Sequence, residues 1–265
     1  MTSDRLPWPL GLCVAVLLAV IVAPLVVPIA MSISDTPYIV FPPEGFTLEW
    51  YGAVLSDPEA QASLIVSLKI AMLSTVIALA LGIPCAMALV RCRFPGRAAV
   101  LALVLGPLVV PLIVTGVGLL QFFSAIGLRG AFIQLLIGHT VICIPYVVRS
   151  VSGALTTADP TLEDAARVLG AGPVRIFTHV IWPQIRPGIA AGGIFAFIIS
   201  FDDFAISMWL ADARSFPLPL FLYAAIQKFF DPSIAALSAL MVFFALGLVL
   251  LIEKGLGIGV RRIAG

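Results

Sequence analysis

Two adjacent carboxylates, Asp202 and Asp203, are the side chains of this 265-residue chain with the clearest capacity for chemistry, because they interrupt an apolar stretch. No charged residue occurs between Arg186 and Asp202. A lone aspartate at the centre of a bilayer costs about 2.5–3.5 kcal/mol on insertion scales, so acids in such positions are candidate functional groups. In a low dielectric, a carboxylate there would attract an ammonium group strongly.

The spacing around the two acids predicts different surroundings for each. Ser200, Asp203 and Ser207 follow one another at i, i+3 and i+7, so they would form a polar stripe on one face of a helix. We expect this stripe to place Asp203 on a water-accessible path. Asp202 shares the face of Trp209, and we expect neighbouring helices, or a break in its own helix, to hold it. Together these five residues form the candidate pathway set.

A purely structural role is the alternative for both acids. Each carboxylate could accept hydrogen bonds from backbone amides instead of facing a path. Either could also pair with Lys69, which lies near the outer end of another apolar segment. The residue types alone leave both readings open.

The composition places the chain in a membrane. Hydrophobic residues make up 61% and charged residues 11% of the sequence, whereas soluble domains carry roughly 25% charged residues. The four cysteines form no C-x-x-C pair and there are only two histidines, so neither a disulfide framework nor a metal site is predicted. The near-zero net charge gives no reason to expect a nucleic-acid partner.

Hydropathy predicts an all-α integral membrane fold, a bundle of six spanning helices in a single domain over residues 1–265. The first segment is longer than a signal-peptide core and lacks an A-x-A site, so we expect it to be retained. Gly188 and Gly192 have the GxxxG spacing of close helix packing, either inside the bundle or at a dimer face. The six segments are 10–33, 64–90, 98–124, 131–152, 188–211 and 233–252.

The distribution of Lys and Arg predicts the orientation. Positive charge collects on the cytoplasmic side of membrane proteins. With six spans both termini lie on one side, together with the loop 153–187, and this is the basic side. We therefore expect both termini and this loop to be cytoplasmic in a bacterial inner membrane. The residues on this side are Arg5, Arg91, Arg93, Arg97, Arg149, Arg167, Arg175, Arg186, Lys254, Arg261 and Arg262.

The loop 153–187 carries its own helical signals. Asp159 can cap a helix and Pro160 suits its first position, while Gly170 is placed to end it. Leu162, Ala165, Ala166 and Leu169 would form an apolar stripe opposite Glu163, Asp164 and Arg167. A second short helix is predicted from Pro173 to Trp182, ended by Pro183 and Pro187. By periodicity alone, such helices could dock a partner or rest on lipid.

The loop resembles the E-A-A-x3-G-x9-I-x-L-P coupling loop of ABC-importer permeases. The matching residues are Asp164-Ala165-Ala166, Gly170 and Val180-Ile181-Trp182-Pro183. The resemblance implies a type I ABC importer permease, with a cytoplasmic coupling helix between spans 4 and 5 that docks in a cleft of the ATP-binding subunit. The residues to which it assigns docking are Glu163, Asp164, Ala165, Ala166, Leu169, Gly170 and Pro183.

A second resemblance covers residues 60–255 and includes Ser200-Phe201-Asp202-Asp203, Leu218-Pro219-Leu220 and Asp231-Pro232. These runs are similar to the spermidine/putrescine-type permeases, which implies a polyamine or another cationic or zwitterionic solute such as an opine, an amino-acid derivative or an aminophosphonate. The implied partners are two ATP-binding subunits, a second homologous permease that forms a heterodimer, and a periplasmic or lipoprotein solute-binding protein.

Other function classes fit the sequence less well. The phosphate-binding pattern G-x4-G-K-[ST] is absent, so we expect no enzyme activity, no catalytic or metal-binding residue and no cofactor in this chain, with ATP and Mg held by the partner subunits. An ion-coupled secondary transporter, with Asp202 and Asp203 as a proton site, is the alternative, but it would need no coupling loop. A membrane-embedded enzyme would need a nucleophile beside a base, and none is evident.

Overall fold

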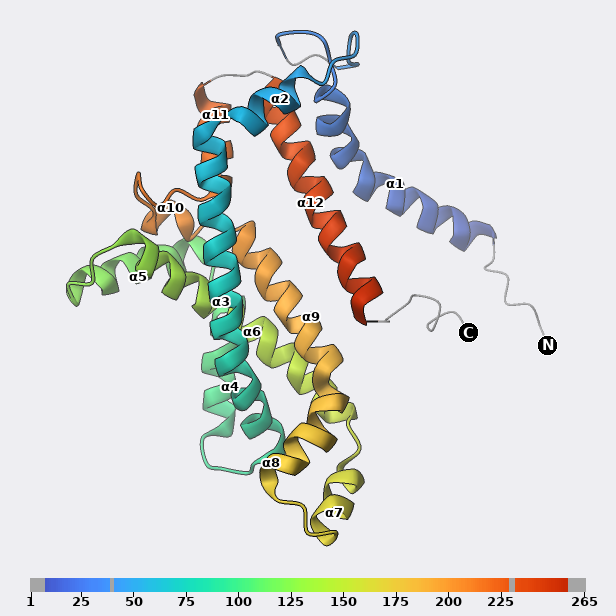
Figure 1. Ribbon diagram of the computed structural model, residues 1–265, viewed down its shortest axis with the longest axis vertical. Coiled ribbons are helices and arrows are strands. Elements are labelled where there is room, and N and C mark those ends of the chain that lie inside the picture. Colours follow the sequence, from blue (N-terminus) through green and yellow to red (C-terminus); the bar gives the residue numbers. More distant parts are fainter. Residues whose placement is uncertain (1–7, 39–40, 229–231, 257–265) are drawn as a thin grey trace. The chain divides into compact units, whose positions relative to one another are not determined.

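The computed structural model describes residues 8–38, 41–228 and 232–256, with the side chains of residues 9–38, 41–228 and 232–247. Within these ranges every regular element is helical (Figure 1). The chain divides into two compact units, residues 1–61 with 221–265, and residues 62–220. The residues cited above for orientation or resemblance that lie outside the described ranges are Arg5, Asp231, Arg261 and Arg262, together with the Lys254 side chain.

The first unit contains α1 (Trp8–Met31), α2 (Glu49–Ser56) and α12 (Pro232–Leu256), together with most of α11 (Leu218–Lys228), and α12 packs against α1 and α2. The loop after α1 is tied to α2 by two hydrogen bonds. The Trp50 indole donates to the Ser34 carbonyl at 2.8 Å, and the Tyr51 and Ser32 hydroxyls lie 2.6 Å apart. Most side chains of α1 are apolar and exposed, as expected of a lipid-facing helix.

The second unit is built on α3 (Pro58–Arg91), α6 (Ala131–Thr157) and α9 (Trp182–Phe201). Helices α6 and α9 lie side by side (Figure 1), and α6 contributes more residues to the buried core than any other helix. Gly188 and Gly192 allow this approach: a Cβ at Gly188 would lie 2.8 Å from the Ser150 carbonyl oxygen, and one at Gly192 would lie 3.0 Å from the Val147 Cα. The GxxxG pair is therefore used inside the chain.

The predicted span 98–124 is not one continuous helix. The segment forms α4 (Arg97–Leu105), a 3-10 turn η1 (Gly106–Leu108) and α5 (Leu112–Ala125), and the two halves bend by 106°. Pro111 stands at the bend in an extended conformation. A proline lacks the amide hydrogen that a continuous helix needs, which explains why the helix stops here.

The number of membrane-crossing helices is lower than six in the described residues. Four helices are long and apolar enough to cross a bilayer, and the bent pair would supply a fifth as one broken span. The sixth predicted span falls on α12, whose described apolar part is the shorter Pro232–Gly247. The six-span count therefore stays a prediction.

The predicted fifth span, 188–211, is wrong at both ends. Upstream, α8 (Pro173–Ile176) and a π-helical turn, η2 (Phe177–Ile181), run directly into α9, so Pro183 and Pro187 do not end a helix. The Trp182 amide donates to the Phe177 carbonyl five residues back, and this wider turn relieves the crowding that Pro183 would cause. Downstream, the helix stops at Phe201, and α10 (Ser207–Leu210) and α11 (Leu218–Lys228) follow.

We expect Gly188→Ala to loosen the α6–α9 pair, because the new Cβ would lie 2.6 Å from the Ala154 Cβ and 2.8 Å from a backbone oxygen. Overpacking of this kind costs about 1–3 kcal/mol. The melting temperature of the purified protein in detergent should fall by several degrees. Gly153→Ala is the matched control, because Gly153 lies on α6 and a Cβ there would meet no atom within 4 Å. Equal melting temperatures for the two variants would contradict the packing role.

Candidate functional site

The break after α9 is capped by Asp203. Its Oδ2 accepts hydrogen bonds from the amides of Ile206 and Ser207, each at 3.0 Å. These amides lie at the start of α10 and have no carbonyl partner within that helix, so an aspartate three or four residues earlier is a suitable acceptor. Asp203 is only 5% exposed. The structural alternative that the sequence left open, binding to backbone amides, is the one Asp203 adopts.

Asp202, in contrast, is exposed on the surface of the second unit. The expected partition placed Asp203 on the path and had Asp202 held by neighbouring helices or by a break in its own helix. The break is present at Asp202, but Asp203 is the buried acid and Asp202 is the exposed one. The helical spacing of 100° per residue ceases to apply because the backbone leaves the helix at Asp202, whose amide makes the last helical bond, to Ile198. Among the described residues, no ion pair joins Lys69, which is exposed, to either acid.

Ser200, Asp203 and Ser207 do come together, although by another route than a helical stripe. His139 from α6 lies between them, with Nδ1 2.8 Å from Ser200 Oγ and Nε2 3.1 Å from Ser207 Oγ. Its Nε2 is 3.7 Å from Asp203 Oδ2. Ser74 from α3 extends the group, with its hydroxyl 2.9 Å from that of Ser200. We call these five residues the buried polar cluster, since each is at most 5% exposed.

His139 is a member of the cluster that the sequence patterns did not predict. A histidine inside the apolar segment 131–152 was the available signal, because polar groups in such segments need partners. Its partners could not be identified, since they lie 61 and 68 residues further along the chain.

Two glycines, one on α5 and one on α6, allow close packing against the backbone that follows the break. A Cβ at Gly116 on α5 would lie 3.2 Å from the Ala205 carbonyl oxygen and 2.8 Å from Trp209 Cδ1. A Cβ at Gly138 on α6 would lie 3.1 Å from Ile206 Cγ2. The non-helical backbone therefore packs against helices α5 and α6, which agrees with the rule that irregular backbone at membrane depth is buried in protein or lines a cavity.

Trp209, the fifth member of the candidate pathway set, is half-buried and lines a cavity of about 470 Å³ beside the break. Arg129, Gln134 and Asp212 line the same cavity, so it carries a charge of each sign. The Trp209 indole nitrogen is buried and has no hydrogen-bond partner among the described residues. Trp209 therefore lines this cavity and is not a member of the buried polar cluster.

The second candidate region is the helix α7 (Pro160–Val168), whose predicted ends are confirmed. Asp159 accepts a hydrogen bond from the Thr161 amide, Pro160 is the first helical residue, and Gly170 has a φ of +80°, which suits glycine at a helix end. Hydrogen bonds from the Thr161 hydroxyl and amide lower the pKa of Asp159. Leu169 is 87% exposed, so an apolar surface remains free on the chain by itself.

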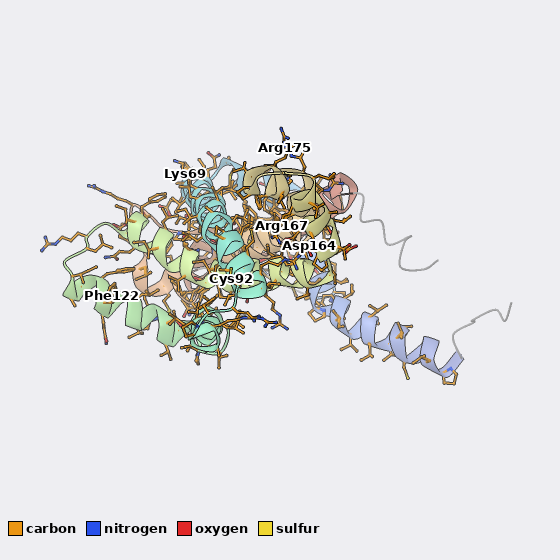
Figure 2. The ribbon with its side chains drawn as sticks, turned by 90° about the horizontal axis from the view of Figure 1, so that it is seen from below. Lys69, Cys92, Phe122, Asp164, Arg167 and Arg175 are labelled. Atoms are coloured by element: carbon orange, nitrogen blue, oxygen red, sulfur yellow. The ribbon has the colours of Figure 1, made fainter. Side chains whose placement is uncertain are left out.

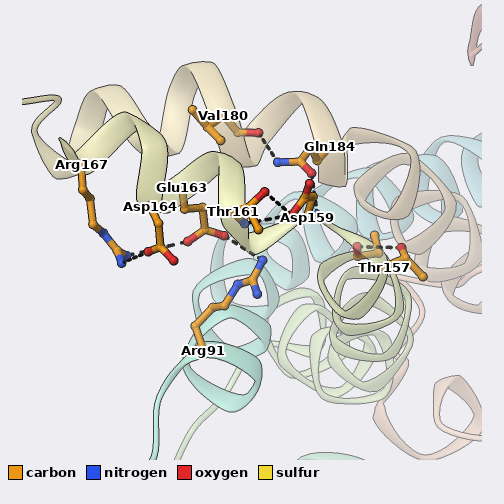
Figure 3. Close-up of polar contacts among 10 residues, drawn as sticks. Arg91, Thr157, Asp159, Thr161, Glu163, Asp164, Arg167, Val180 and Gln184 are labelled. Atoms are coloured by element: carbon orange, nitrogen blue, oxygen red, sulfur yellow. Dashed lines mark hydrogen bonds and ion pairs between the residues drawn. The ribbon is translucent and has the colours of Figure 1, made fainter. Parts of the chain in front are cut away.

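On α7 one charged residue is buried, whereas two leucines are exposed. Glu163 is buried and pairs with Arg91 at the end of α3, with Nη2 and Oε1 2.7 Å apart (Figure 3). Leu162 and Leu169 point away from the second unit and are exposed. The carboxylate of Glu163 therefore anchors α7 to α3, and the assignment of Glu163 to partner docking stays a prediction.

The remaining residues assigned to docking stay accessible. Asp164, Ala165, Leu169, Gly170 and Pro183 are exposed, and Ala166 is half-buried. Asp164 pairs with Arg167 at 3.1 Å, and Figure 2, which looks onto this end of the second unit, shows the two side chains near each other. Gln184 joins α7 to the π-helical turn by accepting from the Asp159 amide and donating to the Val180 carbonyl, both at 2.9 Å.

Comparison with known proteins agrees with this architecture. The family described as "Binding-protein-dependent transport system inner membrane component" matches residues 72–263, most of the chain. The chain belongs to this family. It is thus a membrane-spanning permease of an ABC importer, and the relatives that define it are transport components.

Individual relatives differ in what they transport. The spermidine/putrescine transport system permease protein PotC of Haemophilus influenzae is 31% identical to the permease over 78% of this chain and 81% of its own length. The molybdenum transport system permease protein ModB of Mycobacterium tuberculosis is 32% identical over 82% and 86%. The putrescine transport system permease protein PotI of Escherichia coli is 32% identical over 75% and 73%.

Solved structures support the fold over the full length. A chain of a bacterial ABC transporter involved in the import of the acidic polysaccharide alginate superimposes with a TM-score of 0.70 at 19% identity, over 98% of the permease and 99% of that chain. A chain of an amino acid ABC transporter superimposes with a TM-score of 0.60 at 19% identity, over 79% of the permease and 98% of that chain. These likenesses establish the ABC permease fold.

We expect Gly116→Ala to disturb the break, because its Cβ would press on the Ala205 carbonyl and Trp209. Gly118→Ala, two residues along α5 with no atom near its Cβ position, is the matched control. The melting temperature of the assembled complex should fall by several degrees in the first variant, at a cost of about 1–3 kcal/mol, and stay unchanged in the second. A tolerated alanine at position 116 would show that the close approach is not required.

We expect Glu163→Gln to loosen α7, since it leaves the Arg91 guanidinium without its charged partner. Removing the charge of one partner from a nearly buried ion pair costs about 1–3 kcal/mol. Backbone amides of α7 should then exchange with deuterium about tenfold faster. Asp164→Asn is the control, because the exposed Asp164–Arg167 pair contributes little. Equal exchange in both variants would exclude Glu163 as the anchor.

Proposed function

We propose that the permease forms, with a second homologous permease, the translocation path for a small cationic or zwitterionic solute, a polyamine such as spermidine or putrescine in the first place. The observation that carries the proposal is the exposed carboxylate of Asp202 at a break in a membrane-spanning helix. The polyamine relatives PotC and PotI support the same class of solute.

The charge of Asp202 gives the proposal its physical basis. At an effective dielectric constant of about 20, two opposite unit charges 4 Å apart attract by about 4 kcal/mol. A broken helix is a recurring way to build a solute site in transporters, since free backbone groups and acids meet there near the middle of the bilayer. A polyamine would be drawn to this point and released again as its surroundings change.

The relative ModB suggests a second candidate, an oxyanion such as molybdate. The same carboxylate argues against it, because an anion beside Asp202 would be repelled. Opines, amino-acid derivatives and aminophosphonates carry an amino group and stay compatible with Asp202. The charge dependence of transport therefore separates these classes of solute.

The rest of the assembly follows from the docking loop. The exposed residues Asp164, Ala165 and Leu169 would dock on an ATP-binding subunit, and closure of two such subunits would pull on α7. The Arg91–Glu163 pair and Gln184 would carry that movement to α3 and α9. ATP and Mg are held by these partners, a solute-binding protein delivers the solute from the periplasm, and both termini of the permease lie in the cytoplasm.

We expect Asp202→Asn to lower ATP-dependent uptake of labelled spermidine by about tenfold, equivalent to about 1.4 kcal/mol. Putrescine, with fewer ammonium groups, should lose less, and Asp202→Glu should recover most of the uptake because it keeps the charge. The assay uses proteoliposomes that contain the complete importer and its solute-binding protein. Glu59→Gln, at an exposed acid in the first turn of α3 that belongs neither to the proposed path nor to the proposed docking residues, is the control for general loss of function.

Three results would contradict the proposal. Uptake of spermidine that is unchanged in Asp202→Asn would remove the carboxylate from the path. Molybdate uptake by the unmodified importer would assign the permease to the oxyanion class. Uptake driven by an ion gradient without ATP would replace the ABC mechanism with secondary transport.

A further inference from the structure

The break between α9 and α10 is spanned by one side chain from a different helix. His139 Nδ1 lies 2.8 Å from the hydroxyl of Ser200, in the last turn of α9, and Nε2 lies 3.1 Å from the hydroxyl of Ser207, the first residue of α10. The imidazole therefore joins the two ends of the interrupted helix. His139 is 1% exposed, so this contact is sealed from solvent.

The hydrogen-bonding capacity of the cluster is matched to an uncharged imidazole. A neutral imidazole offers one donor and one acceptor, and each serine hydroxyl can donate once and accept. If Nδ1 donates to Ser200, then Ser200 can donate to Ser74, Ser74 donates to the Ala71 carbonyl at 3.2 Å, and Ser207 donates to Nε2. The hydroxyl protons of Ser74, Ser200 and Ser207 then each have an acceptor within the protein, and no water is needed.

The carboxylate of Asp203 does not close the break alone. Its Oδ2 holds two amides, but its Oδ1 is buried and has no hydrogen-bond partner among the described residues. Both of these amides belong to the α10 side of the break. His139 is the group that reaches across to Ser200 on the α9 side.

The backbone that follows the break is packed closely against α6. Ile206 has no exposed surface and lies against Gly138, one residue before His139 on α6. Densely packed interiors have discrete arrangements and do not deform continuously. Movement of α6 or loss of its imidazole would therefore release Ser200, Ser207 and the backbone between them together.

We propose that His139 is a positioning residue: it fastens α9 to α10, keeps Asp203 turned inward, and so directs Asp202 out of the second unit toward the solute. The importance of this arrangement for transport rests on the proposed function, but the fastening itself does not. Loss of the imidazole should separate α9 from α10 and expose the residues that follow the break. The difference in burial between Asp202 and Asp203 should then become smaller.

The test measures accessibility in the membrane, without solute. Single cysteines are placed at Asp202, which is exposed, and at Ile206, which is fully buried, in a complete importer whose native cysteines are replaced by alanine. A membrane-impermeant maleimide should label position 202 readily and position 206 hardly at all. Adding His139→Leu should raise the labelling rate at position 206 at least tenfold.

Matched variants distinguish loss of the His139 hydrogen bonds from nonspecific destabilisation of the protein. Thr140→Val alters the next residue of α6, whose hydroxyl donates to the Leu136 carbonyl of its own helix, and should leave position 206 protected. His139→Gln keeps a donor and an acceptor in the side chain and should restore protection to within about threefold. A merely space-filling role would make the leucine variant protective and the glutamine variant no better.

Unchanged protection of position 206 in His139→Leu would overturn the proposal. If that variant fails to assemble with its ATP-binding subunits, Ser207→Ala is used instead, because it removes only the contact between the Ser207 hydroxyl and His139 Nε2. Unchanged protection of position 206 in Ser207→Ala would also overturn the proposal. Because labelling needs no solute, the two proposals can fail separately. Faster labelling of position 206 in His139→Leu, together with normal spermidine uptake in Asp202→Asn, would support the role of His139 and reject the proposed class of solute.

Discussion

Backbone amides freed inside an apolar environment have to find acceptors, and the second unit of this permease is organised around that requirement. An unsatisfied group in hydrocarbon costs several kcal/mol, which is why continuous helices dominate membrane proteins. Here a helix stops at Phe201, and the chain meets the cost with Asp203, whose carboxylate takes the amides of Ile206 and Ser207. The buried polar cluster and the small residues around it follow from this one interruption.

The interruption also explains how two neighbouring acids acquire opposite roles. In a continuous helix Asp202 and Asp203 would differ by 100° in direction, and both would remain near the same depth and dielectric. At the break one carboxylate turns back to cap the next helix while the other stays outside. One carboxylate thus completes the protein's own hydrogen bonding, while the other stays exposed.

A comparable division of work occurs in the docking loop. The charged residue Glu163 faces the protein and pairs with Arg91, whereas the apolar residues Leu162 and Leu169 remain exposed. An ion pair fixes direction well because its geometry is specific, and an exposed apolar surface supplies affinity for a partner through burial. The loop is therefore held to α3 by an ion pair, and its two leucines stay exposed.

The sequence by itself determined the features that depend on nearby residues. Composition placed the chain in a membrane, the caps at Asp159 and Gly170 defined α7, and the coupling-loop motif indicated the family. What only the tertiary structure decided are the features set by distant partners. The passage of α9 through Pro183 and the end of that helix at Phe201 depend on how neighbouring residues satisfy or replace backbone bonds. His139 and Arg91 became visible as partners only when α6 and α3 were in place. Local patterns measure propensity and polarity, whereas the direction of Asp202 and Asp203 depends on bonds to residues from across the fold.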